Sequence, residues 1–105
     1  MGVHRITSPA ARAYAAREKV IGKGITVLGE ASEKVTSLSK KHLEELGDVA
    51  AELVPHSPGY AGKILQIVAR LFWALAGVPE KEAEVVDVEA LDEKLDKLHK
   101  IIQEA

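Results

Sequence analysis

The sequence has no cysteine and few aromatic residues. Without cysteine there is no disulfide framework, no thiolate metal site and no cysteine nucleophile. The aromatic residues are too few and too dispersed to form a platform on which nucleic-acid bases stack. They are Tyr14, Tyr60, Phe72 and Trp73.

The chain also lacks an excess of charge of either sign. Its 105 residues include 14 basic and 16 acidic side chains, whereas a dedicated nucleic-acid-binding domain is usually strongly basic. Residues 1–23 nevertheless sum to +4 (five basic, one acidic), and residues 79–105 sum to −5 (four basic, nine acidic). The two ends could pair within one bundle or between two antiparallel subunits, or form two solvated faces of opposite bias.

No catalytic or cofactor-binding motif is present. The stretch GYAGK at residues 59–63 lacks the glycine spacing and the preceding strand of a phosphate-binding loop. Asp92, Asp96 and His99 share one helical face and resemble half of a metal site, but no second cluster of matching type accompanies them. His42 falls within an apolar stripe, which is typical of a half-buried histidine. We therefore expect a non-catalytic protein with no metal and no cofactor.

The N-terminal stretch MGVHRITSPAARAYAAR contains three arginines and no acid, as transit peptides do. A helix start explains the same residues more simply, with Ser8 as the N-cap and Pro9 at the first helical position. The stretch lacks the long apolar core of a secretory signal. We expect residues 1–8 to form a tail and the protein to be cytoplasmic.

Helical periodicity dominates the rest of the sequence, and no run alternates as a half-buried strand does. The pattern predicts helices at about 9–21, 31–54, 58–76 and 88–104. Short turns make consecutive helices antiparallel. The predicted fold is therefore all-α, a single domain built as an antiparallel bundle of three to four helices.

The stretch GKGITVLG decides how the first helix ends. Each interior glycine costs a helix about 1 kcal/mol relative to alanine, so the three glycines from Gly22 to Gly29 favour a break or a kink. On a continuous helix, Gly22 and Gly29 would instead line up with Ala15 and Thr26. Such a groove of small residues would let a second helix approach closely. The sequence leaves both alternatives open.

The helix at 58–76 is apolar on all sides except one narrow strip. That strip consists of Lys63, Gln66 and Arg70. Helices of this kind are nearly surrounded by others, so we expect it to be the core helix, with Leu71 and Trp73 buried. Its unbroken apolar part, about 15 residues, is shorter than the roughly 20 that span a bilayer. A membrane-inserting hairpin is the alternative.

Local signals mark the helix ends. Ser57, before a proline, repeats the N-cap signal of the first helix. Gly77 is placed to end the third helix, and Asp87 is placed to cap the fourth. In the fourth helix, aliphatic residues recur at steps of four, three and four and should face the core or a partner chain. They are Leu91, Leu95, Leu98 and Ile102.

The absence of catalytic and cofactor-binding motifs and the surplus of apolar surface together predict a protein-interaction module that self-associates as a homodimer. Its expected interface is the small-residue face of the first helix with the aliphatic residues beside it. This set is Ala15, Ile21, Gly22, Ile25, Thr26, Leu28 and Gly29. The alternative is a membrane-active protein, or one that binds lipid or another apolar ligand, with a pocket around Tyr60, Phe72 and Trp73.

Overall fold

The computed structural model describes residues 9–105, and the regular elements in this part of the chain are all helices, without strands. Two short 3-10 helices, Val35–Ser37 and Val54–His56, lie in the first two connections. The all-α helical bundle predicted from the sequence is confirmed, whereas the predicted cap Ser8 lies outside the described residues. The α-helices, in chain order, are α1 (Pro9–Ser32), α2 (Lys40–Leu53), α3 (Gly59–Ala76) and α4 (Val88–Glu104).

α1 is one continuous helix of 24 residues that runs through the glycine-rich stretch. The predicted end near residue 21 is therefore wrong, and the continuous alternative holds. A side chain at Gly24 would collide with Leu53 of α2, whereas the space beside Gly22 and Gly29 is open. Gly24 thus lets α1 and α2 approach closely. Tertiary packing of this kind stabilises a helix that propensity alone would not.

The chain instead leaves the α-helical conformation at residues 33–39, inside the helix predicted at 31–54. At the end of α1, the Ser32 hydroxyl donates to the backbone carbonyl three residues earlier (2.7 Å). Ser39 Oγ then accepts from the His42 backbone N–H (3.2 Å) as the N-cap of α2. Serine side chains that bond to nearby backbone compete with a helix interior in this way. The predicted start at residue 31 was therefore wrong.

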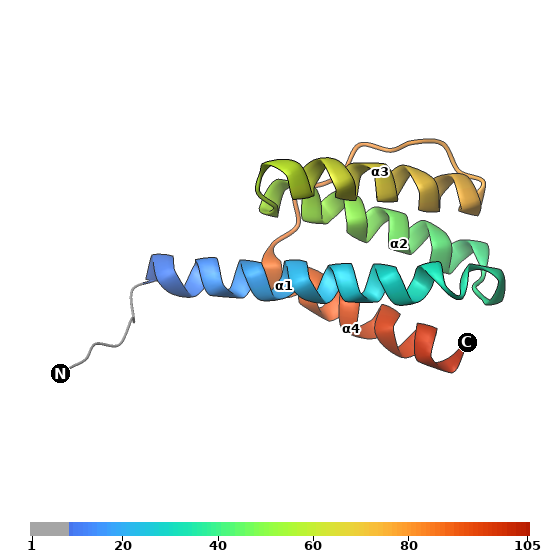
Figure 1. The fold of residues 1–105 in the computed structure, drawn as a ribbon, viewed down its shortest axis with the longest axis horizontal. Coiled ribbons are helices and arrows are strands. Elements are labelled where there is room, and N and C mark those ends of the chain that lie inside the picture. Colours follow the sequence, from blue (N-terminus) through green and yellow to red (C-terminus); the bar gives the residue numbers. More distant parts are fainter. Residues whose placement is uncertain (1–8) are drawn as a thin grey trace.

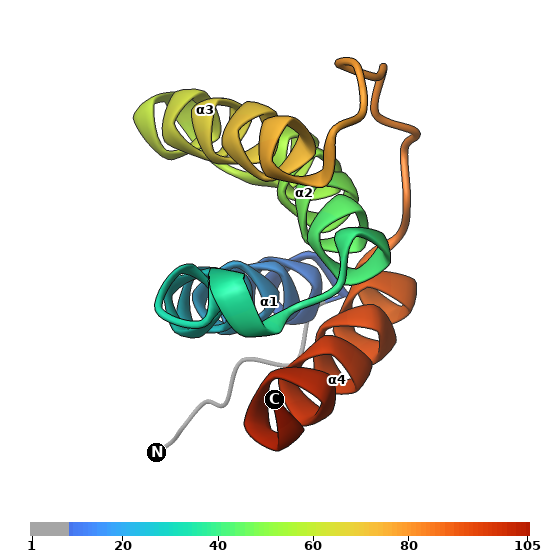
Figure 2. The same cartoon turned by 90° about the vertical axis from the view of Figure 1, so that its right-hand side faces the viewer.

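The directions of the helices follow from the lengths of their connections. α1, α2 and α3 alternate in direction, as short connections require (Figure 1). α4 runs the same way as α3, because the link at 77–87 returns along the bundle before α4 begins (Figure 1). Viewed along the helices, α2 lies between α3 on one side and α1 with α4 on the other (Figure 2).

The most deeply buried part of the core is aliphatic and lies where α1, α2 and α4 meet, and α3 adds Phe72 and Trp73 to the core. The four residues of α4 predicted to face inward are all buried. The predicted N-cap of α4 is also confirmed, because Asp87 Oδ1 accepts from the Ala90 backbone N–H (2.8 Å). Gly77 ends α3 in the left-handed conformation (φ 76°), as predicted. The largest fully buried side chains are Val27, Leu46, Val49, Leu53, Leu91, Leu95 and Ile102.

α3 is not surrounded by other helices, so its predicted role as the core helix is wrong. Trp73 is buried as expected, but Leu71 is 59% exposed. One face of α3 packs on α2, and the opposite apolar face has no helix against it in this part of the chain. Nor is Ser57 the cap of this helix. Pro58 takes the N-cap position, and the Ser57 hydroxyl donates to the Leu53 carbonyl oxygen (2.9 Å).

Candidate functional site

α3 carries a second apolar face that points away from α2. Its residues are spaced four, three, four and four apart, so they form one stripe along the helix. Each of them is at least half exposed. The stripe, named here the α3 stripe, consists of Tyr60, Ile64, Ile67, Leu71 and Leu75.

The two apolar faces of α3 explain why its sequence is apolar almost all round. The face toward α2 is buried, and a narrow polar strip separates it from the α3 stripe on one side. On the other side, half-buried Val68 joins the two faces. The buried face consists of Gly62, Leu65, Ala69, Phe72, Trp73 and Ala76.

An open groove of about 620 Å³ runs between α1 and α3. From α1 it is lined by Ile25, Leu28, Gly29 and Ser32, and from α3 by aliphatic residues that include much of the α3 stripe. The same side of the molecule is the one on which α1 and α3 stand apart (Figure 2). This surface is named here the α1–α3 groove, and its volume exceeds that of the hollows beside the link and between α2 and α4.

The interface predicted on α1 lies partly in this groove. Ile25 is 54% exposed, and Gly29 has open space where a side chain would stand. Leu28 is buried but also lines the groove. Sequence reasoning missed the larger contribution, which comes from α3. The spacing of the apolar residues on α3 is visible in the sequence, but it predicts burial within the bundle rather than an exposed face.

The other predicted interface residues lie beside the groove rather than in it. Ala15, Gly22 and Thr26 are exposed, and Ile21 is half-buried against the core. The Thr26 hydroxyl donates to the Gly22 carbonyl oxygen (3.1 Å), so it is bonded within its own helix.

The three aromatic residues predicted to form an apolar pocket are not brought together. Phe72 lines the α1–α3 groove, whereas Tyr60 is 80% exposed and does not line it. Trp73 lies on the opposite side of α3, where its Nε1–H donates to Asp48 Oδ1 of α2 (2.9 Å). Any apolar ligand would therefore meet mainly aliphatic side chains.

The complementary charges of the two chain ends meet within one chain. Lys23 Nζ of α1 lies 2.6 Å from Asp92 Oδ1 and 2.8 Å from Asp96 Oδ1 of α4. Hydrogen bonds, first to Asp92 and then to Asp96, raise the pKa of Lys23 above its ordinary value. His99 Nδ1 lies 2.9 Å from Glu30 Oε1. The acids suggested as half of a metal site are thus paired, and residues 9–105 contain no cluster of three metal-ligating side chains.

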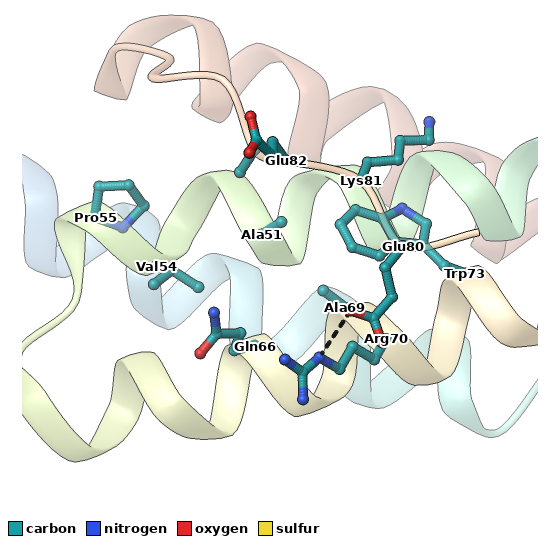
Figure 3. A pocket seen from close by; sticks show the side chains of 11 residues that line it. Ala51, Val54, Pro55, Gln66, Ala69, Arg70, Trp73, Glu80, Lys81 and Glu82 are labelled. Carbon is teal, nitrogen blue, oxygen red and sulfur yellow. Dashed lines mark ion pairs between the residues drawn. The ribbon is translucent and has the colours of Figure 1, made fainter. Parts of the chain in front are cut away.

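The link at 77–87 runs along the polar side of α3. Arg70 Nε lies 3.4 Å from Glu80 Oε1 beside a hollow of about 300 Å³, which Gln66 and Trp73 also line (Figure 3). Lys81 forms ion pairs with Glu44 and Asp48 of α2. Hydrogen bonds to these two carboxylates, Glu44 first, raise the pKa of Lys81. These contacts hold the link in place and leave the α1–α3 groove on the uncovered side.

Comparison with known proteins gives one relative over nearly the whole length. An uncharacterized protein of Archaeoglobus fulgidus is 60% identical over 98 residues, which cover 93% of this chain and 91% of that protein. The chain belongs to the same family as this archaeal protein. No protein-family model and no solved structure matches the chain. In the part of the chain that the structure describes, none of the helices has the length and apolarity needed to cross a bilayer.

Proposed function

We propose that the protein is a non-catalytic interaction module that self-associates through the α3 stripe and the α1–α3 groove. The observation that carries the proposal is the continuous exposed apolar surface on two neighbouring helices. A single chain leaves this apolar surface exposed to water. A second copy of the chain would cover it on both chains. Interfaces of permanent homodimers are more hydrophobic than an average protein surface, as this face is.

The size of the exposed face suits a dimer. Aliphatic side chains that are half exposed leave on the order of 100 Å² each, so the α3 stripe with Ile25 presents roughly 600–700 Å² per chain. A standard interface buries about 800 Å² per partner. The largest apolar patch of a typical monomer is about 300–600 Å². The face therefore supplies most of the area that a stable pair of chains needs.

Sedimentation equilibrium tests the proposal with one charge placed in the interface. The wild-type chain should sediment at twice its mass of 11.3 kDa in the micromolar range. Leu71→Glu should give a folded monomer, because the side chain is exposed within one chain and would be desolvated only between two.

Val85→Glu is the matched control. Val85 is 84% exposed and lies on the link, away from the groove, so this variant should remain a dimer. Helical circular dichroism should be unchanged in both variants. A wild-type chain that stays monomeric throughout the micromolar range would overturn the proposal.

An apolar small molecule is the second candidate occupant. The volume of the groove and its aliphatic lining lie within the range typical of ligand pockets. Wild-type protein that is monomeric, and that binds a hydrophobic dye which Leu71→Glu no longer binds, would favour this alternative.

A further inference from the structure

The residues of the α3 stripe have nearly the same spacing whether the helix is followed from its N-terminus or from its C-terminus. Pairing two copies of α3 in opposite directions about Ile67 places Tyr60 opposite the partner's Leu75 and Ile64 opposite the partner's Leu71. Ile67 then meets the partner's Ile67. A two-fold symmetric interface requires this kind of self-complementarity. The spacing of the stripe is also that of helices packed nearly in line, as in bundles and coiled coils.

α1 carries charges in the reverse of the order that its own dipole favours. Between residues 12 and 19 of α1, three exposed basic side chains accompany one acidic side chain, whereas the last turn of α1 carries Glu30 and the turn directly after the helix carries Glu33 and Lys34. Acidic side chains stabilise the start of a helix and basic side chains its end. α1 has no acidic residue in its first turn and no basic residue in its last turn. A second α1 running the opposite way would set the basic start of each helix near Glu30 and Glu33 at the end of the other.

The projecting start of α1 fits the same arrangement. The first turns of α1 extend past the other helices (Figure 1), and every side chain from residue 12 to residue 19 is exposed. Because α1 and α3 run in the same direction, one two-fold axis that reverses α3 also reverses α1. Gly29 and Ser32 line the groove on the α1 side, and Gly29 leaves room there for a large side chain of the partner.

We infer that the partner is a second copy of this chain bound antiparallel, with α3 against α3 and α1 against α1 around a two-fold axis near Ile67 and Ile25. This inference rests on the proposed self-association and adds its geometry. The interface core is then a bundle of four helices, two from each chain. The α1–α3 groove closes because both of its walls meet their symmetry mates.

Single cysteines test the geometry, because the natural chain has none. Under mild oxidation, Ile67→Cys should form a linked dimer, since a disulfide needs Cβ atoms about 3.5–4.5 Å apart. Ile64→Cys and Leu71→Cys should each link poorly alone but should link to one another when the two chains are mixed. Val85→Cys reports random collision. Ile67→Cys should link on the order of a hundredfold faster, because the dimer holds the two thiols at millimolar effective concentration.

The possible results separate this inference from the proposal beneath it. If the wild-type chain sediments as a dimer but Ile64→Cys and Leu71→Cys each link to themselves faster than to one another, pairing is parallel and the inference fails while self-association stands. If Ile67→Cys links no faster than Val85→Cys in a sedimenting dimer, the axis does not pass near Ile67. A wild-type monomer would overturn both.

Discussion

At the scale of single residues, Gly47 lets a large aromatic ring enter the core. A side chain at this position would collide with the indole of Trp73. The ring is buried, and its Nε1–H is satisfied by Asp48, one residue after the glycine. A buried tryptophan needs such a partner. Two neighbouring positions of α2 therefore provide the space and the hydrogen bond that hold α3 in place.

Gly47→Ala should lower the free energy of unfolding by about 1–3 kcal/mol through overpacking, although alanine is the better helix former by about 1 kcal/mol. Gly22→Ala is the matched control, because Gly22 is exposed on α1 with open space beside it. That change should stabilise by about 0.5–1 kcal/mol. Urea unfolding at one fixed chain concentration measures both. Stabilisation by Gly47→Ala would contradict the packing described for Trp73.

At the scale of elements, neighbouring residues of α3 have opposite roles. Phe72 is buried against the rest of the bundle, whereas Leu71 belongs to the α3 stripe. Truncation of Phe72 removes packing in the core, whereas truncation of Leu71 removes only exposed surface that a partner would cover. The sequence expectation that Leu71 is buried would make its truncation about as costly as that of Phe72.

Phe72→Ala should cost about 3–5 kcal/mol, the usual range for a buried phenylalanine. It should lower the melting temperature at every protein concentration. Leu71→Ala should leave the melting temperature of dilute protein nearly unchanged and reduce its rise with concentration, which reports binding to the folded state. Thermal melts of both variants over a range of concentrations provide the measurement. Equal losses in dilute protein would show that Leu71 belongs to the core.

The cap of α4 gives a second prediction for an element. Asp87→Ala should lower the free energy of unfolding by about 1 kcal/mol, because the Ala90 backbone N–H loses its acceptor. Asp87→Asn is the control, since asparagine caps about as well as aspartate. Urea midpoints should place the asparagine variant near the wild type. Equal destabilisation by both would point to the charge of Asp87 rather than its capping bond.

Sequence reasoning found those parts of the elements that depend on local chemistry. The cap at Asp87, the stop at Gly77 and the inward face of α4 follow from neighbours along the chain. It missed the break at residues 33–39, because the apolar period continues across it. Leu38 is buried although it lies between two helices, so its place in the apolar pattern reflects burial rather than helix formation.

The groove could not be predicted because helical periodicity shows which faces are apolar but not how many neighbours cover them. α3 has apolar residues on both of its wide faces, and only one of these faces meets a helix in the described chain. The continuity of α1 was equally undecided. Whether Gly24 breaks the helix or admits Leu53 depends on a contact between residues far apart in the sequence.

At the scale of the whole molecule, charge joins α4 to both α1 and α2. Lys94 Nζ lies 3.0 Å from Glu52 Oε1, a carboxylate of α2 that is almost fully buried. Lys34 Nζ donates to the Ile102 carbonyl oxygen (3.1 Å). With Lys23 on its two aspartates, these contacts tie the ends of the chain to its middle.

The raised pKa values of Lys23 and Lys81 predict how stability depends on pH. A lysine whose pKa is higher in the folded state stabilises fully below its unfolded value, here 10.5, and loses that contribution as pH rises through the folded value. The free energy of unfolding should therefore fall above about pH 10.5. Urea midpoints near pH 8 and near pH 11.5, on either side of the ordinary lysine pKa, measure the drop.

The double variant Lys23→Met and Lys81→Met is the control for this pH dependence, because it removes these two ammonium groups and leaves every other titratable group in place. It should show a smaller alkaline drop than the wild type. A drop of equal size would mean that these two ammonium groups contribute nothing to it.

Residues 77–87 run back along the bundle before α4 begins, so α4 reaches its place beside α1 only after the other helices have been made. α2 and α3 are close in sequence and can form a hairpin as soon as both have left the ribosome, whereas Lys23 must wait for acids about seventy positions later. Contacts so distant along the chain form slowly. α1 precedes α4 in the chain and thus keeps part of its core face in water until α4 has been synthesised. The burial of α1 is therefore completed only when α4 emerges.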